Sequence, residues 1–128
     1  MITALYACVL ALLFIWLAFQ VIKQRRINKV AYADGGVEPL QIARSAQSNA
    51  AEYIPITLIL MCLLEYNGAS VWWVHMTGLL FVVGRVLHAR AILSNQLKGR
   101  VTGMKLTFAS MLTLVILNLV YLPYGNLW

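Results

Sequence analysis

Four long apolar stretches, separated by short polar connectors, dominate the pattern of the chain. The first has no charged residue between residues 2 and 22, and the second is clearly apolar from residue 54 to residue 64. A helix of about 20 apolar residues is long enough to cross the hydrocarbon core of a bilayer. The pattern therefore predicts an all-α integral membrane protein, with four antiparallel transmembrane helices bundled into a single membrane domain over residues 1–128. The expected helices run from about 2 to 26, 40 to 65, 71 to 93 and 101 to 122.

Composition supports this class and excludes others. Of the 128 residues, 62% are hydrophobic and 11% are charged, whereas a soluble domain is about 45–50% apolar and about 25% charged. The surface of a soluble domain needs polar groups that this chain lacks. A water-soluble enzyme, a nucleic-acid-binding protein and a disordered chain are therefore excluded. Cys8 and Cys62 lie far apart in apolar runs, so we interpret them as small hydrophobic residues and expect no disulfide or metal site.

Lysine and arginine residues gather around two of the three connectors. The amino-terminal end, the second connector and the carboxyl-terminal end carry none. Because cytoplasmic loops are enriched in Lys and Arg, the first and third connectors are expected in the cytoplasm and both termini outside, in an inner membrane. The first stretch has its basic residues after the apolar run, which predicts a retained helix rather than a signal peptide. The basic residues concerned are Lys23, Arg25, Arg26 and Lys29, then Arg85, Arg90, Lys98, Arg100 and Lys105.

Two polar pairs fall inside the predicted spans. Asn49 and Glu52 are three residues apart, as are Arg85 and His88, so each pair shares a helix face. A charged side chain at bilayer depth costs about 2.5–3.5 kcal/mol on insertion scales and usually faces protein or water. Antiparallel neighbours would bring the pairs to one depth, with Arg85 as a counter-ion of Glu52. The pairs therefore form either an ion pair that holds the bundle together or a polar ligand site open to the cytoplasm.

Three motifs carry a resemblance to a known family. The string Asn49-Ala-Ala-Glu52-Tyr53-Ile-Pro55 resembles the Asn-x-x-Glu-x-x-Pro signature of the membrane-associated proteins in eicosanoid and glutathione metabolism. The string Arg85-Val-Leu-His88 is similar to the Arg-x-x-His of the third helix in several members. Gln20-Val-Ile-Lys-Gln-Arg25-Arg26 is similar to the double-arginine end of the first helix in leukotriene C synthase. Chain length and the order of the motifs fit the family over nearly all of the sequence.

The resemblance implies a fold and a function. The family fold is a four-helix bundle that assembles as a homotrimer and binds glutathione between neighbouring protomers near the cytoplasmic face. By this resemblance we expect a glutathione-dependent transferase or peroxidase that acts on a lipophilic electrophile drawn from the lipid bilayer. Glutathione would be the co-substrate, because its carboxylates require arginine, its amine a carboxylate, and its thiolate a nearby cation.

The resemblance also implies roles for single residues. Arg25 would hold a glutathione carboxylate from the adjacent protomer, Glu52 would bind the glutathione amine, and Arg100 would stabilise the thiolate as the catalytic residue. The full set of expected glutathione-binding residues is Arg25, Arg44, Gln47, Asn49, Glu52, Tyr53, Arg85 and His88.

Three departures from the family pattern keep other functions open. Ser45 stands where the family usually has arginine, and the nearest arginine, Arg44, lies about 100° away around an ideal helix. Ile92 replaces a tyrosine, and Met104 replaces an aromatic residue. These losses favour an alternative, a non-catalytic membrane binding protein of the same fold. A small multidrug exporter is a more distant rival, because such exporters use a deep acidic residue in a first helix that here has no charge.

Overall fold

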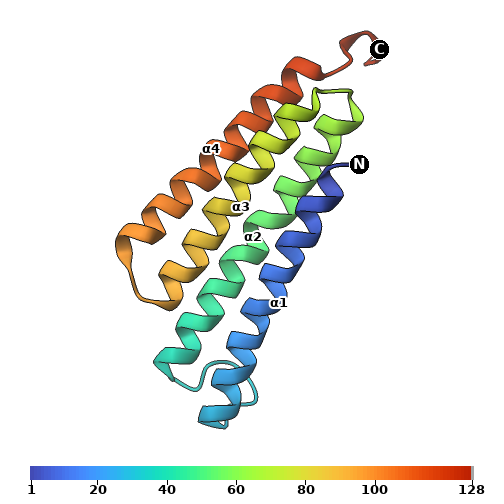
Figure 1. The fold of residues 1–128 in the computed structure, drawn as a ribbon. Helices are drawn as coiled ribbons and strands as arrows, with labels where there is room; N and C mark the ends of the chain where they lie inside the picture. Colours follow the sequence, from blue (N-terminus) through green and yellow to red (C-terminus); the bar gives the residue numbers. More distant parts are fainter. Residues whose placement is uncertain (128) are drawn as a thin grey trace.

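A computed structural model describes residues 1–127 and contains four long helices. The chain runs up and down, so that both termini lie at one end of the bundle and the α1–α2 and α3–α4 loops lie at the other (Figure 1). Each of the four helices is long and apolar enough to cross a membrane. The predicted antiparallel four-helix fold is thus confirmed. The elements are α1 Thr3–Asn28, α2 Glu38–Tyr66, α3 Val71–Leu93, α4 Leu97–Tyr121 and a short 3₁₀ helix, η1 Tyr124–Asn126.

The helices extend beyond the apolar runs at the loop end. Helix α1 continues to Asn28 and stops where Lys29 adopts a left-handed conformation, with φ of 54°. Helix α4 begins at Leu97, four residues before the apolar run that starts at Val101. Apolar residues mark the part of a helix that lies in hydrocarbon, whereas backbone geometry sets where the helix ends. The polar turns of α1 and α4 therefore project beyond the apolar segment.

Close backbone contact joins α3 to α4. A Cβ atom added to Gly103 of α4 would lie 2.7 Å from the backbone nitrogen of His88 and 2.8 Å from the carbonyl oxygen of Gly84. A Cβ atom on Gly84 would lie 3.0 Å from the Cβ of Leu106. In lipid, where helices gain little from hydrophobic burial against one another, small residues permit the close approach that gives good packing. These two glycines fix how α3 and α4 sit against each other.

Buried hydroxyl and amide groups find partners inside the bundle. Ser110 of α4 donates to the carbonyl of Thr77 on α3 at 2.8 Å, and Asn118 donates to the carbonyl of Leu60 on α2 at 3.0 Å. The hydroxyls of Thr57 and Thr107 each donate to the carbonyl one turn earlier in their own helix. Because hydrocarbon offers no hydrogen bonds, such internal satisfaction is required of a spanning segment.

A carboxylate from α2 caps the start of α1. Glu65 accepts hydrogen bonds from the backbone nitrogens of Ile2 and Thr3, and from the Thr3 hydroxyl at 2.7 Å. The first N–H groups of a helix have no partner within the helix, so this carboxylate satisfies two of them and suits the positive end of the helix dipole. Nearby, the Tyr6 hydroxyl lies 2.8 Å from Nδ1 of His75. These contacts join the ends of α1, α2 and α3.

The α3–α4 contact gives a prediction about stability. Gly103→Ala should lower the free energy of unfolding by about 1–3 kcal/mol, because the added methyl group forces two backbones apart. Gly125→Ala is the matched control, since no atom of residues 1–127 lies within 4 Å of its added Cβ. Reversible unfolding in mixed micelles would measure both. Equal stability of the two variants would contradict the close contact.

Candidate functional site

The centre of the candidate site is Arg85, which is 1% exposed although it carries a charge. It lies eight residues, or roughly 12 Å, before the end of α3. Its Nη1 donates to Oδ1 of Asn49 on α2 at 2.8 Å. Its Nε is buried and has no hydrogen-bond partner among the described residues. A buried charge normally requires an opposite charge or full hydrogen bonding. The Arg85 guanidinium meets neither condition, because its Nε–H remains an unused donor.

Aromatic and sulfur-containing side chains surround the guanidinium. The ring of Tyr53, one turn after Asn49 on α2, lies 5.5 Å from the central carbon of Arg85, within range of a cation–π interaction. Phe108 of α4 packs edge-on against Tyr53, with ring centroids 5.7 Å apart. The sulfur of Met104 lies 4.0 Å from Nη2 of Arg85. Three helices therefore contribute to one cluster, of which α4 supplies the apolar side.

His88 lies beside this cluster, one turn after Arg85 on α3, and is 4% exposed. Its backbone nitrogen and Cβ lie against Gly103, so the glycine contact fixes its position. Asn49, Tyr53 and Arg85 therefore meet within one chain, and His88 is buried one turn further along α3.

The expected pairing of Arg85 with Glu52 is corrected by the structure. Arg85 pairs with Asn49, whereas Glu52 is exposed, and no ion pair between Arg85 and Glu52 forms within residues 1–127. The reason is helical geometry, because a residue three positions after Asn49 lies about 60° further around the helix. Asn49 stands at the edge of the packed side of α2, and this rotation carries Glu52 to the open side.

Gln47 and Arg44 lie apart from the cluster as well. Gln47 is two residues before Asn49, so it points to the opposite side of α2 and is half-buried. Arg44 is exposed and forms an ion pair of 3.7 Å with Asp34. A polar hollow of about 270 Å³ on the open side of α2 is lined by Asp34, Gln41, Arg44, Ser45 and Ser48.

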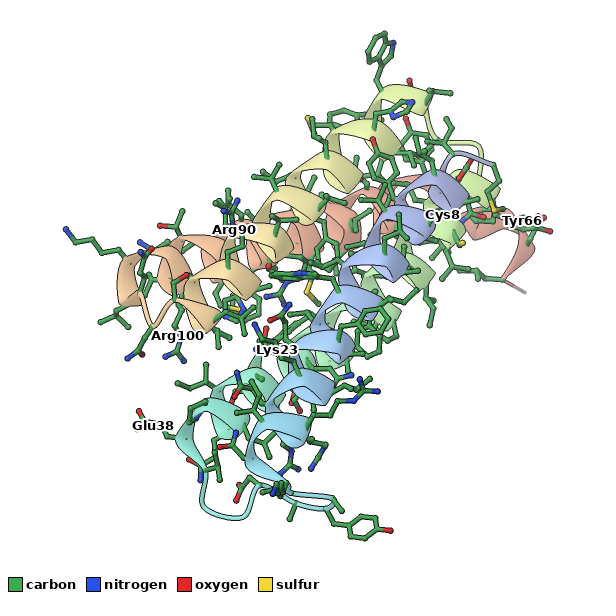
Figure 2. All side chains as sticks on the ribbon, turned by 60° about the horizontal axis from the view of Figure 1, so that its bottom comes forward. Cys8, Lys23, Glu38, Tyr66, Arg90 and Arg100 are labelled. Carbon is green, nitrogen blue, oxygen red and sulfur yellow. The ribbon has the colours of Figure 1, made fainter. Side chains whose placement is uncertain are left out.

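Arg25 and Arg100 occupy the loop end of the bundle. Nη1 of Arg25 donates to the carbonyl of Ala33 at 2.9 Å, so it holds the α1–α2 loop. Arg100 is exposed in the first turn of α4. Figure 2 shows Arg90 and Arg100 toward the loop end of α3 and α4, with Cys8 and Tyr66 at the opposite end of the molecule. Within residues 1–127 of one chain, neither Arg25 nor Arg100 hydrogen-bonds to the buried cluster.

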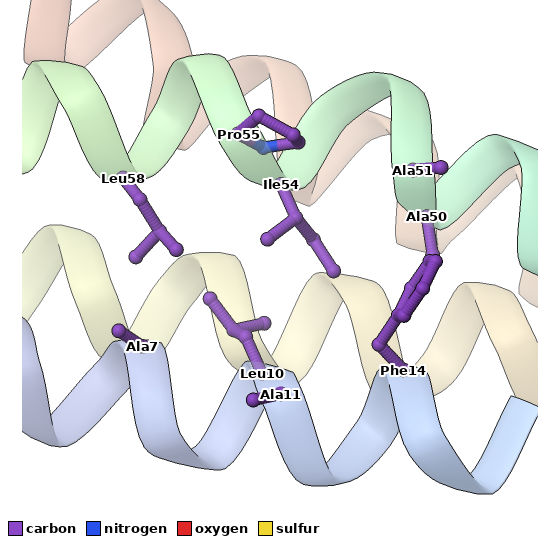
Figure 3. A pocket seen from close by; sticks show the side chains of 9 residues that line it. All are labelled: Ala7, Leu10, Ala11, Phe14, Ala50, Ala51, Ile54, Pro55 and Leu58. Carbon is purple, nitrogen blue, oxygen red and sulfur yellow. The ribbon is translucent and has the colours of Figure 1, made fainter.

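An apolar groove lies on another side of α2. It has a volume of about 290 Å³ and runs between α1 and α2, with Phe14 and Leu10 opposite Ala50 and Ile54 (Figure 3). Pro55 lies in its wall and has no backbone N–H, so the carbonyl of Ala51 lacks its donor within the helix. The groove could accept an apolar molecule from the bilayer.

Two contributors to these contacts were not anticipated from the sequence. Phe108 follows Met104 by four residues on α4, so helical spacing could have placed it beside the cluster. Glu65 stands at the end of the second predicted helix, and no local pattern shows that its partners are 62 and 63 residues away.

Four membrane-length helices around a buried polar cluster define a helical integral membrane protein. Residues 3–120 match the sequence model of the MAPEG family, so the chain belongs to that family, and the predicted resemblance is confirmed. The inner membrane protein YecN of Escherichia coli strain K12 is 40% identical over 124 residues, which cover 97% of this chain and 95% of that protein. YecN of Escherichia coli O6:H1 shows the same identity and coverage.

The Arg85–Asn49 contact gives a second prediction. Asn49→Ala should lower the free energy of unfolding by about 1.5–3 kcal/mol, because it removes a hydrogen bond to a buried charge. The double variant Asn49→Leu with Arg85→Met should recover most of that loss, since it removes the charge as well. Gln47→Ala, on the opposite side of α2, is the control and should change stability little. Unfolding in mixed micelles would measure all three, and no recovery in the double variant would contradict the assignment.

Proposed function

We propose that this protein is a glutathione-dependent transferase or peroxidase that acts on a lipophilic electrophile in the inner membrane. The observation that carries the proposal is the buried guanidinium of Arg85, with an unpartnered Nε, next to Asn49 of the family signature. Membership of the MAPEG family supports the same reaction class. The 40% identical relative is named as an inner membrane protein, which supports the location.

The residues present fit the chemistry of glutathione. This tripeptide has two carboxylates, and a free guanidinium N–H beside an amide suits a carboxylate. Its amine requires an acid, and Glu52 is the acid that lies deep in the apolar half of the chain. Tyr53 and His88 would complete the protein side of the site from α2 and α3.

Arg100 would act at the sulfur. A guanidinium close to the thiol lowers the thiol pKa and favours the thiolate, which is the nucleophile. In the transfer reaction the thiol proton passes to water, and the sulfur forms a bond to the electrophilic carbon. The electron pair displaced from that carbon goes to the leaving group or to an atom that is then protonated.

A homotrimer would complete this site. The open side of α2 carries Arg44, Ser48 and Glu52 in a helix that crosses the membrane, and charged groups there need protein or water as neighbours. A second protomer packed on this side would cover them and bring its own Arg25 toward the glutathione carboxylate. Arg25 would then have to exchange its contact with Ala33 for the ligand.

A non-catalytic binding protein of the same fold is the second candidate. Ile92 is 7% exposed and Met104 is half-buried against Arg85, so neither position where the family has an aromatic residue offers a hydroxyl group near the cluster. Such a protein would bind its ligand without activating a thiol.

Glutathione binding and thiolate formation separate these roles. We expect Glu52→Gln to weaken glutathione binding at least tenfold, on the order of 1.4 kcal/mol, without changing the assembly. Arg100→Gln should retain binding and lose the ultraviolet absorbance of the thiolate, because its charge acts on the sulfur. Lys98→Gln, also exposed near the start of α4, is the control for loss of charge. Titration calorimetry and difference spectra would measure these effects in purified protein.

Two outcomes would redirect the proposal. Binding without thiolate absorbance or conjugation in the unsubstituted protein would support the non-catalytic candidate. Dissociation of the assembly by Glu52→Gln, with glutathione affinity unchanged, would assign Glu52 a structural role alone.

Orientation can be tested at two tyrosines. Tyr32, in the α1–α2 loop, is 88% exposed, and Tyr66, at the end of α2, is 83% exposed. With Cys8 and Cys62 replaced by alanine, Tyr66→Cys should react with a membrane-impermeant maleimide in intact spheroplasts. Tyr32→Cys should react only after the membrane is opened. The reverse pattern would place the loops outside.

A further inference from the structure

Positive charge is distributed unevenly between the two halves of the chain. Five Lys/Arg against four Asp/Glu give the first 65 residues a formal charge of +1, whereas five Lys/Arg and no acid give the remainder +5. The second half forms α3 and α4. Nearly all of the net charge of +6 therefore belongs to the α3–α4 hairpin.

Four of these five charges are exposed close to one loop. We name them the hairpin basic patch: Arg90 near the end of α3, and Lys98, Arg100 and Lys105 in the first turns of α4. Figure 2 shows Arg90 and Arg100 toward this end of α3 and α4. Within residues 1–127 the ion pair that forms is Arg44–Asp34, on the other hairpin. The patch thus has no carboxylate partner in the described chain.

In the α1–α2 hairpin, two of the basic residues have partners within the chain. Arg25 donates to loop carbonyls, and Arg44 faces Asp34. By contrast, the patch has four like charges at one end of the hairpin, and Lys98 and Arg100 lie in the first turn of α4, at the positive end of its dipole, where positive charge is unfavourable. Setting the orientation of a membrane protein requires basic loops, but it does not require acids to be absent. The arrangement therefore favours an anion from outside the chain.

Apolar side chains stand among these charges. Leu97 is 71% exposed and Val101 is 45% exposed, both in the first turns of α4. Lys98 and Arg100 lie between them in the sequence. A surface with both kinds of side chain at the end of a transmembrane helix matches a phospholipid, which has a charged headgroup directly above apolar chains.

We propose that the hairpin basic patch binds the headgroup of an anionic phospholipid at the membrane surface, beside the exposed side chains of Leu97 and Val101. The headgroup phosphate accepts charge-assisted hydrogen bonds from Arg90, Lys98 and Lys105. This binding goes beyond the proposed function, since it requires neither glutathione nor an electrophile. It attaches the α3–α4 hairpin to the lipid surface beside the candidate site.

The test measures thermal unfolding of the purified protein in neutral detergent with added short-chain phosphatidylglycerol. A ligand that binds the folded state raises the midpoint in a concentration-dependent way. The triple variant Arg90→Gln, Lys98→Gln, Lys105→Gln should weaken apparent binding by roughly a factor of five for each lost charge, on the order of a hundredfold in all. Arg100 is left in place because of its role at the sulfur.

The matched control removes three charges from the other loop. The variant Lys23→Gln, Arg26→Gln, Lys29→Gln should retain the response to phosphatidylglycerol. An equal loss in both triple variants would overturn the proposal, because binding would then follow net charge alone. An equal response to short-chain phosphatidylcholine, or to inorganic phosphate, would also overturn it, since neither is an anionic lipid.

If the first triple variant fails to fold, a measurement on the unsubstituted protein still tests the proposal. Native mass spectrometry of protein extracted from mixed phosphatidylglycerol–phosphatidylcholine nanodiscs should show preferential retention of phosphatidylglycerol. Retention should fall as salt concentration rises, because screening weakens exposed charge contacts. Retention of both lipids in the proportion supplied would contradict the proposal.

Discussion

The burial of one arginine without a carboxylate is the constraint on which the candidate site depends. Arg85 is enclosed by α2, α3 and α4, and its charge is stabilised by the Asn49 oxygen, the face of Tyr53 and the sulfur of Met104. None of these groups is an anion, so they solvate the charge without neutralising it. Close contact between α3 and α4 keeps water out, and that contact exists because Gly84 and Gly103 have no side chain. The packing of α3 against α4 therefore also determines the environment of the Arg85 charge.

Much of the fold follows from the sequence, because hydrocarbon permits few alternatives. Apolar runs of sufficient length predict helices, and short connectors make neighbours antiparallel. The same reasoning brought Asn49 to the depth of Arg85, since both lie a similar distance from the loop end. It failed where the outcome depends on rotation about a helix axis, so Glu52 was paired with Arg85 although it lies on the open side of α2. It also missed the cap that Glu65 provides to α1, because contacts across 62 residues leave no local pattern.

The distribution of acids carries information that a count of basic residues misses. Positive charges around the first and third connectors predict orientation equally well, and on that basis the two loops look alike. The acids distinguish them, because all four lie before Tyr66 and none follows. In the first hairpin a basic residue can be bound internally, as Arg44 is by Asp34. The α3–α4 hairpin contains no acid, so its exposed basic residues have no carboxylate partner within the hairpin.

The way polar and apolar side chains are placed around α2 also limits how the proposed reaction can proceed. Asn49 and Tyr53 face α3 and α4, whereas Ala51, Pro55 and Leu58 line the groove with α1. Two residues along a helix correspond to about 200°, so these groups point away from each other across the helix. Glutathione bound at Asn49 and an apolar molecule in the α1–α2 groove of one chain would therefore be separated by the width of α2. For the sulfur to meet an electrophile, the apolar surface must come from α4 or from a neighbouring protomer, and the second of these sources agrees with the assembly proposed from the exposed charges on α2.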